Sequence, residues 1–128
     1  MGNGTPLGRV RGLGASHHGT GHWLQQRLTA LANVLLVTWF VVSLLRLPLG
    51  DYGAVVRWAS NPTVAFALML LVISLFWHLR LGLQVLIEDY VHGAARLLAL
   101  IVLNFYAFGG AAYGIFSIAR IAFAGGAA

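Results

Sequence analysis

The chain has 128 residues, of which 59% are hydrophobic and 9% are charged, a balance that excludes an ordinary soluble domain and is typical of a membrane protein. Its formal net charge of +5 comes from eight arginines, and because most of them stand at the ends of apolar runs, they favour helix anchoring over nucleic-acid binding. The absence of cysteine excludes disulfides, thiol catalysis and iron–sulfur ligation by this chain.

A short polar segment precedes the first apolar run, and it lacks the apolar stretch of a signal peptide. Its tract "HHGTGH", residues 17–22, has the histidine content of metal-binding segments. Glycines interrupt these histidines, and no carboxylate stands near them in the sequence. We therefore interpret the tract as a polar segment that lies against a soluble subunit or the membrane surface.

Three apolar segments follow, at residues 28–47, 63–88 and 97–120. At 1.5 Å per helical residue, each is long enough to cross a hydrocarbon core of about 30 Å. The turn signal "SNP" precedes the second segment. The sequence thus predicts an all-α integral membrane protein with three transmembrane helices and a short polar N-terminal segment, organised as one anchor domain over residues 1–128.

The arginines that flank the spans predict the orientation. Those at positions 9, 11, 27 and 96 share one side of the membrane, and those at 46, 57 and 120 share the other. Because arginines in short flanks are retained on the cytoplasmic side, we expect the N-terminus and the 87–96 loop to face the cytoplasm. We expect a bacterial inner (cytoplasmic) membrane in preference to the mitochondrial inner membrane.

The third span carries Gly110 and Gly114, four residues apart. This small-xxx-small step lets another helix backbone approach closely. It predicts close packing either on another helix of this chain or on a partner subunit.

The second span contains a histidine at a depth where ionisable side chains are rare. A step of about 100° per residue puts Ser74, His78 and Gly82 on one helix face. Three roles fit His78: a packing residue bonded to a neighbouring carbonyl or serine, a member of a proton relay, or an axial haem ligand beside the room that Gly82 leaves. As the only histidine in the spans, it would need a second haem ligand from another chain.

A haem-ligating imidazole has a second ring nitrogen that needs a partner, and Ser74 is the nearest candidate. Arg80 is rotated by about 200° from His78 and lies on a different face. An unpaired guanidinium inside a membrane is costly, so we expect a carboxylate, a haem propionate or a water-filled pocket near Arg80.

Two motifs carry a family resemblance. "H-L-R-L-G-L-Q-V-L-I-E-D-Y-V" at 78–91 and "H-W-L-Q-Q-R-L-T-A" at 22–30 resemble the smaller hydrophobic membrane anchor of succinate dehydrogenase, respiratory complex II. The resemblance implies an anchor that lies among membrane lipids and holds the flavoprotein and iron–sulfur subunits at the membrane. FAD and the iron–sulfur clusters would reside in those partners, and no complete active site would lie in this chain.

The resemblance also implies roles for individual residues. His78 matches the axial ligand to the iron of a haem b shared with the larger cytochrome b anchor subunit. Tyr90 matches a tyrosine that hydrogen-bonds a ubiquinone carbonyl, and Asp89 the acidic neighbour that helps to organise that site. Arg27 matches an arginine near the haem propionates and the quinone region. The chain departs from the better-known enterobacterial pattern after Val91, where His-Gly replaces Lys-Pro. The pattern therefore does not predict the conformation of this loop, but the difference does not affect the match at Tyr90.

The residues themselves leave alternatives open. Tyr90 stands where a phenol donates a hydrogen bond at the headgroup level without carrying charge, but interfacial tyrosines also serve as membrane anchors. The anchor of a fumarate reductase fits the same pattern. So does a non-redox helical membrane protein in which His78 is only packed.

Overall fold

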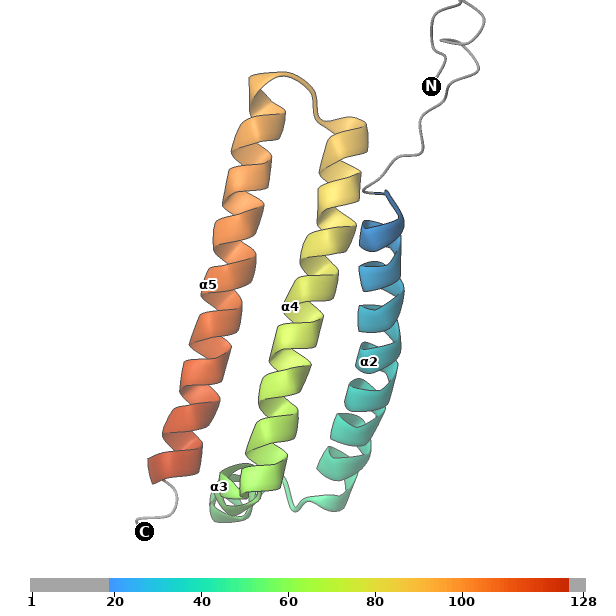
Figure 1. Ribbon diagram of the computed structural model, residues 1–128. Coiled ribbons are helices and arrows are strands. Elements are labelled where there is room, and N and C mark those ends of the chain that lie inside the picture. Colours follow the sequence, from blue (N-terminus) through green and yellow to red (C-terminus); the bar gives the residue numbers. More distant parts are fainter. Residues whose placement is uncertain (1–18, 125–128) are drawn as a thin grey trace, which may run out of the picture.

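The computed structural model describes residues 19–124, which form four helices: α2 (Gly19–Arg46), α3 (Tyr52–Ser60), α4 (Pro62–Tyr90) and α5 (Ala94–Ala124) (Figure 1). Helices α2, α4 and α5 are long and apolar enough to cross a membrane. The predicted all-α fold with three spans is therefore confirmed for the described part of the chain. Helix α2 begins before the predicted residue 28, so the end of the polar lead-in is helical. The first two histidines of "HHGTGH" lie outside the described residues.

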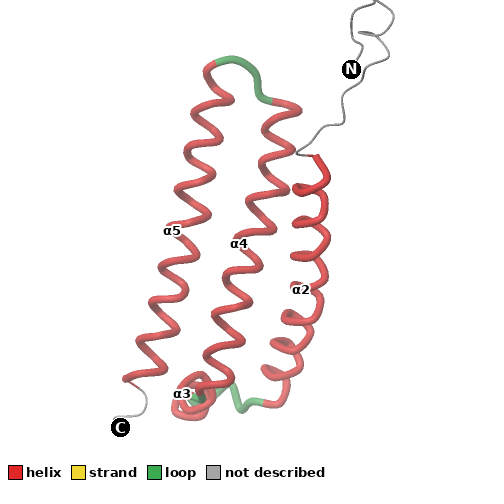
Figure 2. The backbone as a smooth tube through the Cα atoms, in the orientation of Figure 1, coloured by secondary structure: helices red, strands yellow, loops and turns green. Residues whose placement is uncertain are grey.

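The three long helices stand side by side in one layer, with α4 between α2 and α5 (Figures 1 and 2). Among the described residues, α2 and α5 make no direct contact with each other. A layer one helix thick leaves two broad faces open, and large apolar side chains are exposed along all three helices. Such faces are suited to lipid or to partner helices in a membrane.

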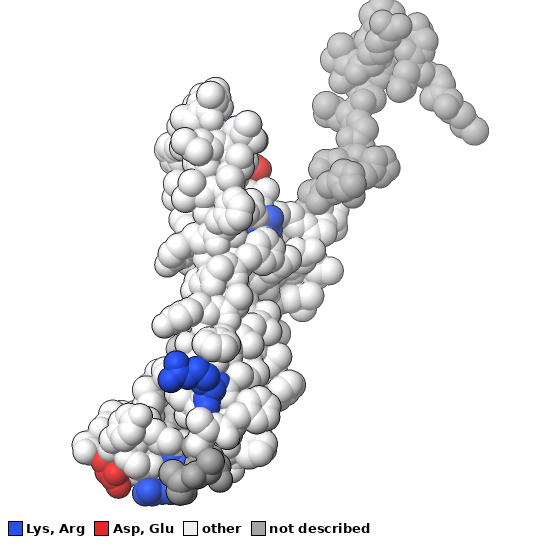
Figure 3. All heavy atoms as spheres, turned by 90° about the vertical axis from the view of Figure 1, so that its left-hand side faces the viewer, with Lys and Arg blue, Asp and Glu red and all other residues white. Residues whose placement is uncertain are grey.

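Charged side chains are sparse on the view in Figure 3, where most of the surface is uncharged. Arg57 lies 3.7 Å from Asp51 near one end of the layer, and Arg96 lies 3.8 Å from Glu88 near the other. All four side chains are at least one-third exposed, so these pairs contribute little to the free energy of folding. Their positions agree with charged residues kept at the two membrane surfaces.

The short helix α3 was not predicted from the sequence. Asp51 caps its N-terminus by accepting a hydrogen bond from the Ala54 N–H at 3.2 Å. It runs across the end of the layer (Figure 2), where the Ser60 hydroxyl oxygen lies 2.8 Å from the Val56 carbonyl oxygen of α3 and 3.1 Å from the Ile121 carbonyl oxygen of α5. The segment is too short for a span, and only its aspartate cap signals a helix. It closes the connection between α2 and α4 on one side of the membrane.

The glycine step packs α5 against α4. A Cβ atom at Gly110 would overlap the Phe76 ring, and one at Gly114 would lie 2.9 Å from a methyl carbon of Val72. Only glycine permits this helix separation without moving those side chains. The prediction of close packing is confirmed, and within the described residues the partner is a helix of the same chain.

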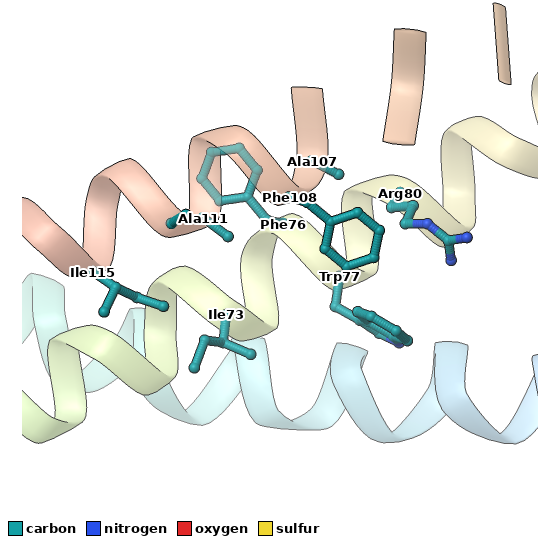
Figure 4. A pocket seen from close by; sticks show the side chains of 9 residues that line it. Ile73, Phe76, Trp77, Arg80, Ala107, Phe108, Ala111 and Ile115 are labelled. Carbon is teal, nitrogen blue, oxygen red and sulfur yellow. The ribbon is translucent and has the colours of Figure 1, made fainter. Parts of the chain in front are cut away.

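Arg80 binds α5 as well. Its Nε donates to Asn104 Oδ1 at 2.7 Å, and the guanidinium carbon lies 5.4 Å from the Trp77 ring centre and 5.7 Å from that of Phe108. Arg80, Trp77 and Phe108 line a groove of about 300 Å³ whose other lining is apolar (Figure 4). Within residues 19–124 no carboxylate pairs with Arg80, so that one of the three expected partners is replaced by a neutral amide and two aromatic faces.

We expect removal of only one partner of the Arg80–Asn104 pair to cost more than removal of both. Asn104→Leu strands the guanidinium in an apolar site and should destabilise the helix pair by about 1–3 kcal/mol. The double variant Arg80→Leu with Asn104→Leu should recover most of that loss, because no buried donor is then left unpaired. Thermal unfolding of the detergent-purified protein measures both. Additive losses in the double variant would contradict the pairing.

Candidate functional site

A stripe of polar side chains runs along the face of α2 that meets α4. The stripe consists of His22, Gln26, Thr29 and Asn33, whose spacing of four, three and four residues places them on one helix face. On α4 it meets Ser74 and His78. We call these six residues the polar seam. A polar seam between two otherwise apolar spans is unusual, because polar groups in lipid surroundings need partners.

His78 lies in this seam and contacts α2. Its Nδ1 is 3.0 Å from the Thr29 hydroxyl oxygen. The Ser74 hydroxyl, which we predicted as the partner of the imidazole, donates instead to the backbone carbonyl of Thr29 at 3.4 Å. That prediction was wrong because α2 presents a hydroxyl closer to the ring. With Nδ1 engaged, only the other ring nitrogen, Nε2, remains for a ligand.

An open groove of about 390 Å³ lies beside His78. It is lined by Asn33, Leu75, Phe76, His78, Leu79 and Tyr106. A step of about 100° per residue puts Leu75 and Leu79 on the side of α4 opposite Ile73 and Trp77, which line the groove beside Arg80. The two grooves therefore lie on opposite faces of the helix layer, and His78 belongs to only one of them.

Three polar atoms of the seam are buried without a hydrogen-bond partner in the described chain. They are His22 Nε2, Gln26 Oε1 and Asn33 Oδ1. Buried polar atoms in native proteins are nearly always paired with protein groups or water. Three unpaired atoms on one face of α2 indicate that water or a group outside the described residues completes the seam. Asn33 borders the groove beside His78, so one of the three stands at that groove.

Asp89 and Tyr90 stand at the end of α4. Tyr90 is 78% exposed there, and Asp89 is also accessible. Their neighbour Glu88 accepts a hydrogen bond from Gln84 at 3.0 Å and pairs with Arg96, which leaves Asp89 as the carboxylate outside that network. Tyr90 lies twelve residues beyond His78, about 18 Å along the axis, and about 120° around the helix from it. The two side chains are therefore far apart.

Arg27 lies apart from His78. It is exposed, and its guanidinium carbon is 5.4 Å from the Trp23 ring centre. At 100° per residue it is rotated by about 130° from the mean direction of the seam residues of α2, and so lies on another side of that helix. The structure therefore brings Thr29, Ser74 and His78 together but leaves Arg27 on another face and Tyr90 at the helix end.

Sequence reasoning missed three polar residues: Thr29, Asn33 and Asn104. The first two continue the helical spacing of His22 and Gln26, a pattern visible in the sequence once α2 is known to begin at Gly19. Asn104 stands ten residues after the start of α5, and Arg80 ten residues before the end of α4. Helices joined by a short loop bring such positions to equal depth.

The described residues contain no cluster of three or more histidine, cysteine, aspartate or glutamate side chains that could hold a metal ion by themselves. Among the described residues, the open apolar groove beside His78 therefore offers a metal ion one imidazole nitrogen. The chain offers a small polar substrate two groups, a phenol and a carboxylate, at the membrane surface. Each set is incomplete and needs groups from another chain or a cofactor.

Comparisons with known proteins place the chain in a family. Residues 1–111 match the family described as succinate dehydrogenase/fumarate reductase transmembrane subunit. Proteins named succinate dehydrogenase hydrophobic membrane anchor subunit are similar: that of Rickettsia bellii is 32% identical over 65% of this chain and 66% of its own length, and that of Paracoccus denitrificans is 26% identical over 91% of each. The chain thus spans just under two thirds of the Rickettsia bellii protein's length.

No solved structure matches the chain. The match over 111 residues covers most of the sequence, including the polar seam, the His78 motif and α4 to its end. It confirms the resemblance drawn from the two motifs. The chain belongs to the succinate dehydrogenase/fumarate reductase transmembrane subunit family.

Proposed function

We propose that this chain is the hydrophobic membrane anchor of a succinate:ubiquinone oxidoreductase. It would hold a soluble flavoprotein and an iron–sulfur protein at the membrane and would pair with a larger cytochrome b anchor. The names of its relatives support this role. Its lack of cysteine assigns the iron–sulfur clusters to a partner, and FAD goes with the flavoprotein.

One observation carries the redox part of the proposal: His78 borders an open apolar groove with Nδ1 bonded to α2, so Nε2 is the nitrogen left for a ligand. These residues fit a haem b, for which a neutral imidazole is a standard axial ligand. His78 would ligate the iron, the unpaired Asn33 would border the group, and the larger anchor would supply the second ligand and the opposite wall. When bound, the haem supplies a one-electron redox centre inside the membrane.

Tyr90 and Asp89 would form part of the ubiquinone site. Tyr90 is exposed at the membrane end of α4, where its hydroxyl can donate to a quinone carbonyl and stabilise the charge that develops as the quinone is reduced. Asp89, which is accessible beside it, can orient that donor or a water that delivers protons. We assign Arg27 to the haem propionate or quinone region. In this proposal a partner chain covers the face of α2 on which Arg27 is exposed.

Two alternatives remain. A fumarate reductase anchor would use the same seam and differ in the direction of electron flow, which the quinone pool used by the complex distinguishes. A non-redox membrane protein is favoured by one observation, the Thr29 contact, because a hydrogen bond to α2 also accounts for a His78 that is only packed. The groove beside the ring and the unpaired Asn33 Oδ1 favour the redox role.

The proposed orientation places the N-terminus and the α4–α5 loop in the cytoplasm of a bacterium. With three spans, the C-terminal end then lies outside. An alkaline phosphatase reporter, active only outside, should be active when fused after Ala128, and the same reporter inserted after Gly93 should be inactive. Activity in the loop fusion alone would reverse the proposed topology.

We expect His78→Ala to abolish or alter the low-spin haem spectrum of the purified complex, because the variant removes the imidazole that this chain presents at the groove. The readout is the dithionite-reduced minus oxidised absorbance spectrum. His92→Ala, which changes an exposed histidine in the α4–α5 loop, is the matched control and should leave the spectrum unchanged. A six-coordinate spectrum that persists in His78→Ala would show that the histidine is only packed.

We expect Tyr90→Phe to slow succinate-driven ubiquinone reduction by roughly 10²-fold, since one positioned donor to developing charge is lost. Succinate oxidation with a soluble dye acceptor should persist, because it does not require the quinone site. Tyr52→Phe is the control: Tyr52 is 82% exposed at the opposite end of the layer, where only an anchoring role is available. Equal quinone reduction by the Tyr90 and Tyr52 variants would reduce Tyr90 to an interfacial anchor.

A further inference from the structure

We propose that Thr29 is a positioning residue for His78: its hydroxyl accepts the Nδ1–H proton and thereby fixes the tautomer in which Nε2 is the iron ligand. This inference rests on the proposed haem role of His78. It concerns α2, which provides no iron ligand of its own in that proposal.

The positions of the heavy atoms decide which group donates. The Thr29 hydroxyl oxygen lies 2.8 Å from the Gln25 carbonyl oxygen, 3.1 Å from the Gln26 carbonyl oxygen and 3.0 Å from His78 Nδ1. A hydroxyl has one proton, and carbonyl oxygens only accept. If that proton pointed to Nδ1, two carbonyl oxygens would face the hydroxyl oxygen at hydrogen-bond distance with no proton between them.

The other assignment leaves one such oxygen, that of Gln26, in place of two, and gives both the shortest contact and the imidazole contact a proton. The hydroxyl donates to the carbonyl one turn earlier, a common bond for threonine in a helix, and its lone pair then accepts from Nδ1–H. The proton of a neutral imidazole is thus on Nδ1, and Nε2 has its lone pair free. An imidazole in this tautomer presents a metal ligand without first losing a proton.

The hydroxyl is itself held in place. Its bond to the Gln25 carbonyl fixes the rotation of the side chain. The Ser74 hydroxyl binds the backbone carbonyl of Thr29, at 3.4 Å, and not its side chain. A partner that orients the other nitrogen of a ligating histidine makes the ligand more basic and fixes its ring plane. In a chain of hydrogen bonds each bond polarises the next, so the bond from the Thr29 hydroxyl to the Gln25 carbonyl makes the hydroxyl a better acceptor for the imidazole.

Loss of the hydroxyl should therefore have a specific signature. A less electron-donating imidazole stabilises the ferric haem less, so the haem reduction potential should become more positive. The ring plane should also lose its fixed direction, which changes the electron paramagnetic resonance g values of the low-spin haem. Haem affinity should fall by about 10-fold or more, the usual effect of removing such a partner. A role confined to helix packing would lower assembly without changing the potential of the haem that is bound.

The experiment compares purified complexes that contain Thr29→Val, Thr29→Ser or Ser74→Ala with wild type. Thr29→Val keeps the shape and removes the hydroxyl, and Thr29→Ser keeps the hydroxyl. Ser74→Ala removes the other hydrogen bond between α2 and α4 at this depth and leaves the imidazole contact in place. Redox titration, the g values and the haem content are measured for each. If Thr29→Val does not assemble, Thr29→Cys replaces it, since a thiol is a weak acceptor.

A more positive potential and altered g values in Thr29→Val alone, with wild-type values in Thr29→Ser and Ser74→Ala, would support the inference. Wild-type values in Thr29→Val would overturn it. Equal changes in Thr29→Val and Ser74→Ala would also overturn it, because they point to helix packing. The proposed haem role has its own test, the haem spectrum of His78→Ala. If that spectrum is unchanged, the haem role is wrong, and the inference about Thr29 is wrong with it.

Discussion

The contact between Thr29 and His78 links α2 to α4 through a polar pair inside the layer of helices. None of the buried apolar residues among those described belongs to α2; they are Ala59, Ala65, Leu71, Leu81, Leu103 and Ala107. In lipid, burial of apolar side chains provides little drive for helix association, so polar contacts and close packing carry it. Helix α5 has close packing, through Gly110 and Gly114. Helix α2 has the polar seam, and its register against α4 depends on the hydrogen bonds at Thr29.

Some polar groups inside the spans have hydrogen-bond partners within the described chain, and others have none. Arg80 is bonded to Asn104 and lies near two aromatic faces of its own chain, which makes it a structural cation. The seam on the other side of α4 is incomplete, because three of its buried atoms have no partner among the described residues. Unpaired polar atoms in apolar surroundings are costly, and their persistence is most simply explained by a bound group or a partner chain.

The sequence predicted the three spans, because hydropathy is a strong signal in a membrane protein, and it singled out His78 as an isolated ionisable residue within them. It did not predict Thr29 as the partner of His78, since contacts between helices depend on rotation and register that periodicity alone leaves open. The same limit explains Asn104. Helix α3 was missed because nine residues give little periodic signal. Tyr90 is the last residue of α4. Only the fold shows that Arg27 lies on a different face of α2 from Thr29, the residue that contacts His78.

The central claim is that the groove beside His78 holds a haem whose iron is bound by Nε2 while Nδ1 stays on Thr29. A cryo-electron microscopy map of the complete complex in lipid tests it most directly. The account predicts planar macrocycle density in the groove, continuous with the His78 ring on the side away from Thr29. Density for lipid or for a partner side chain in that groove, with His78 in contact only with protein, would contradict it.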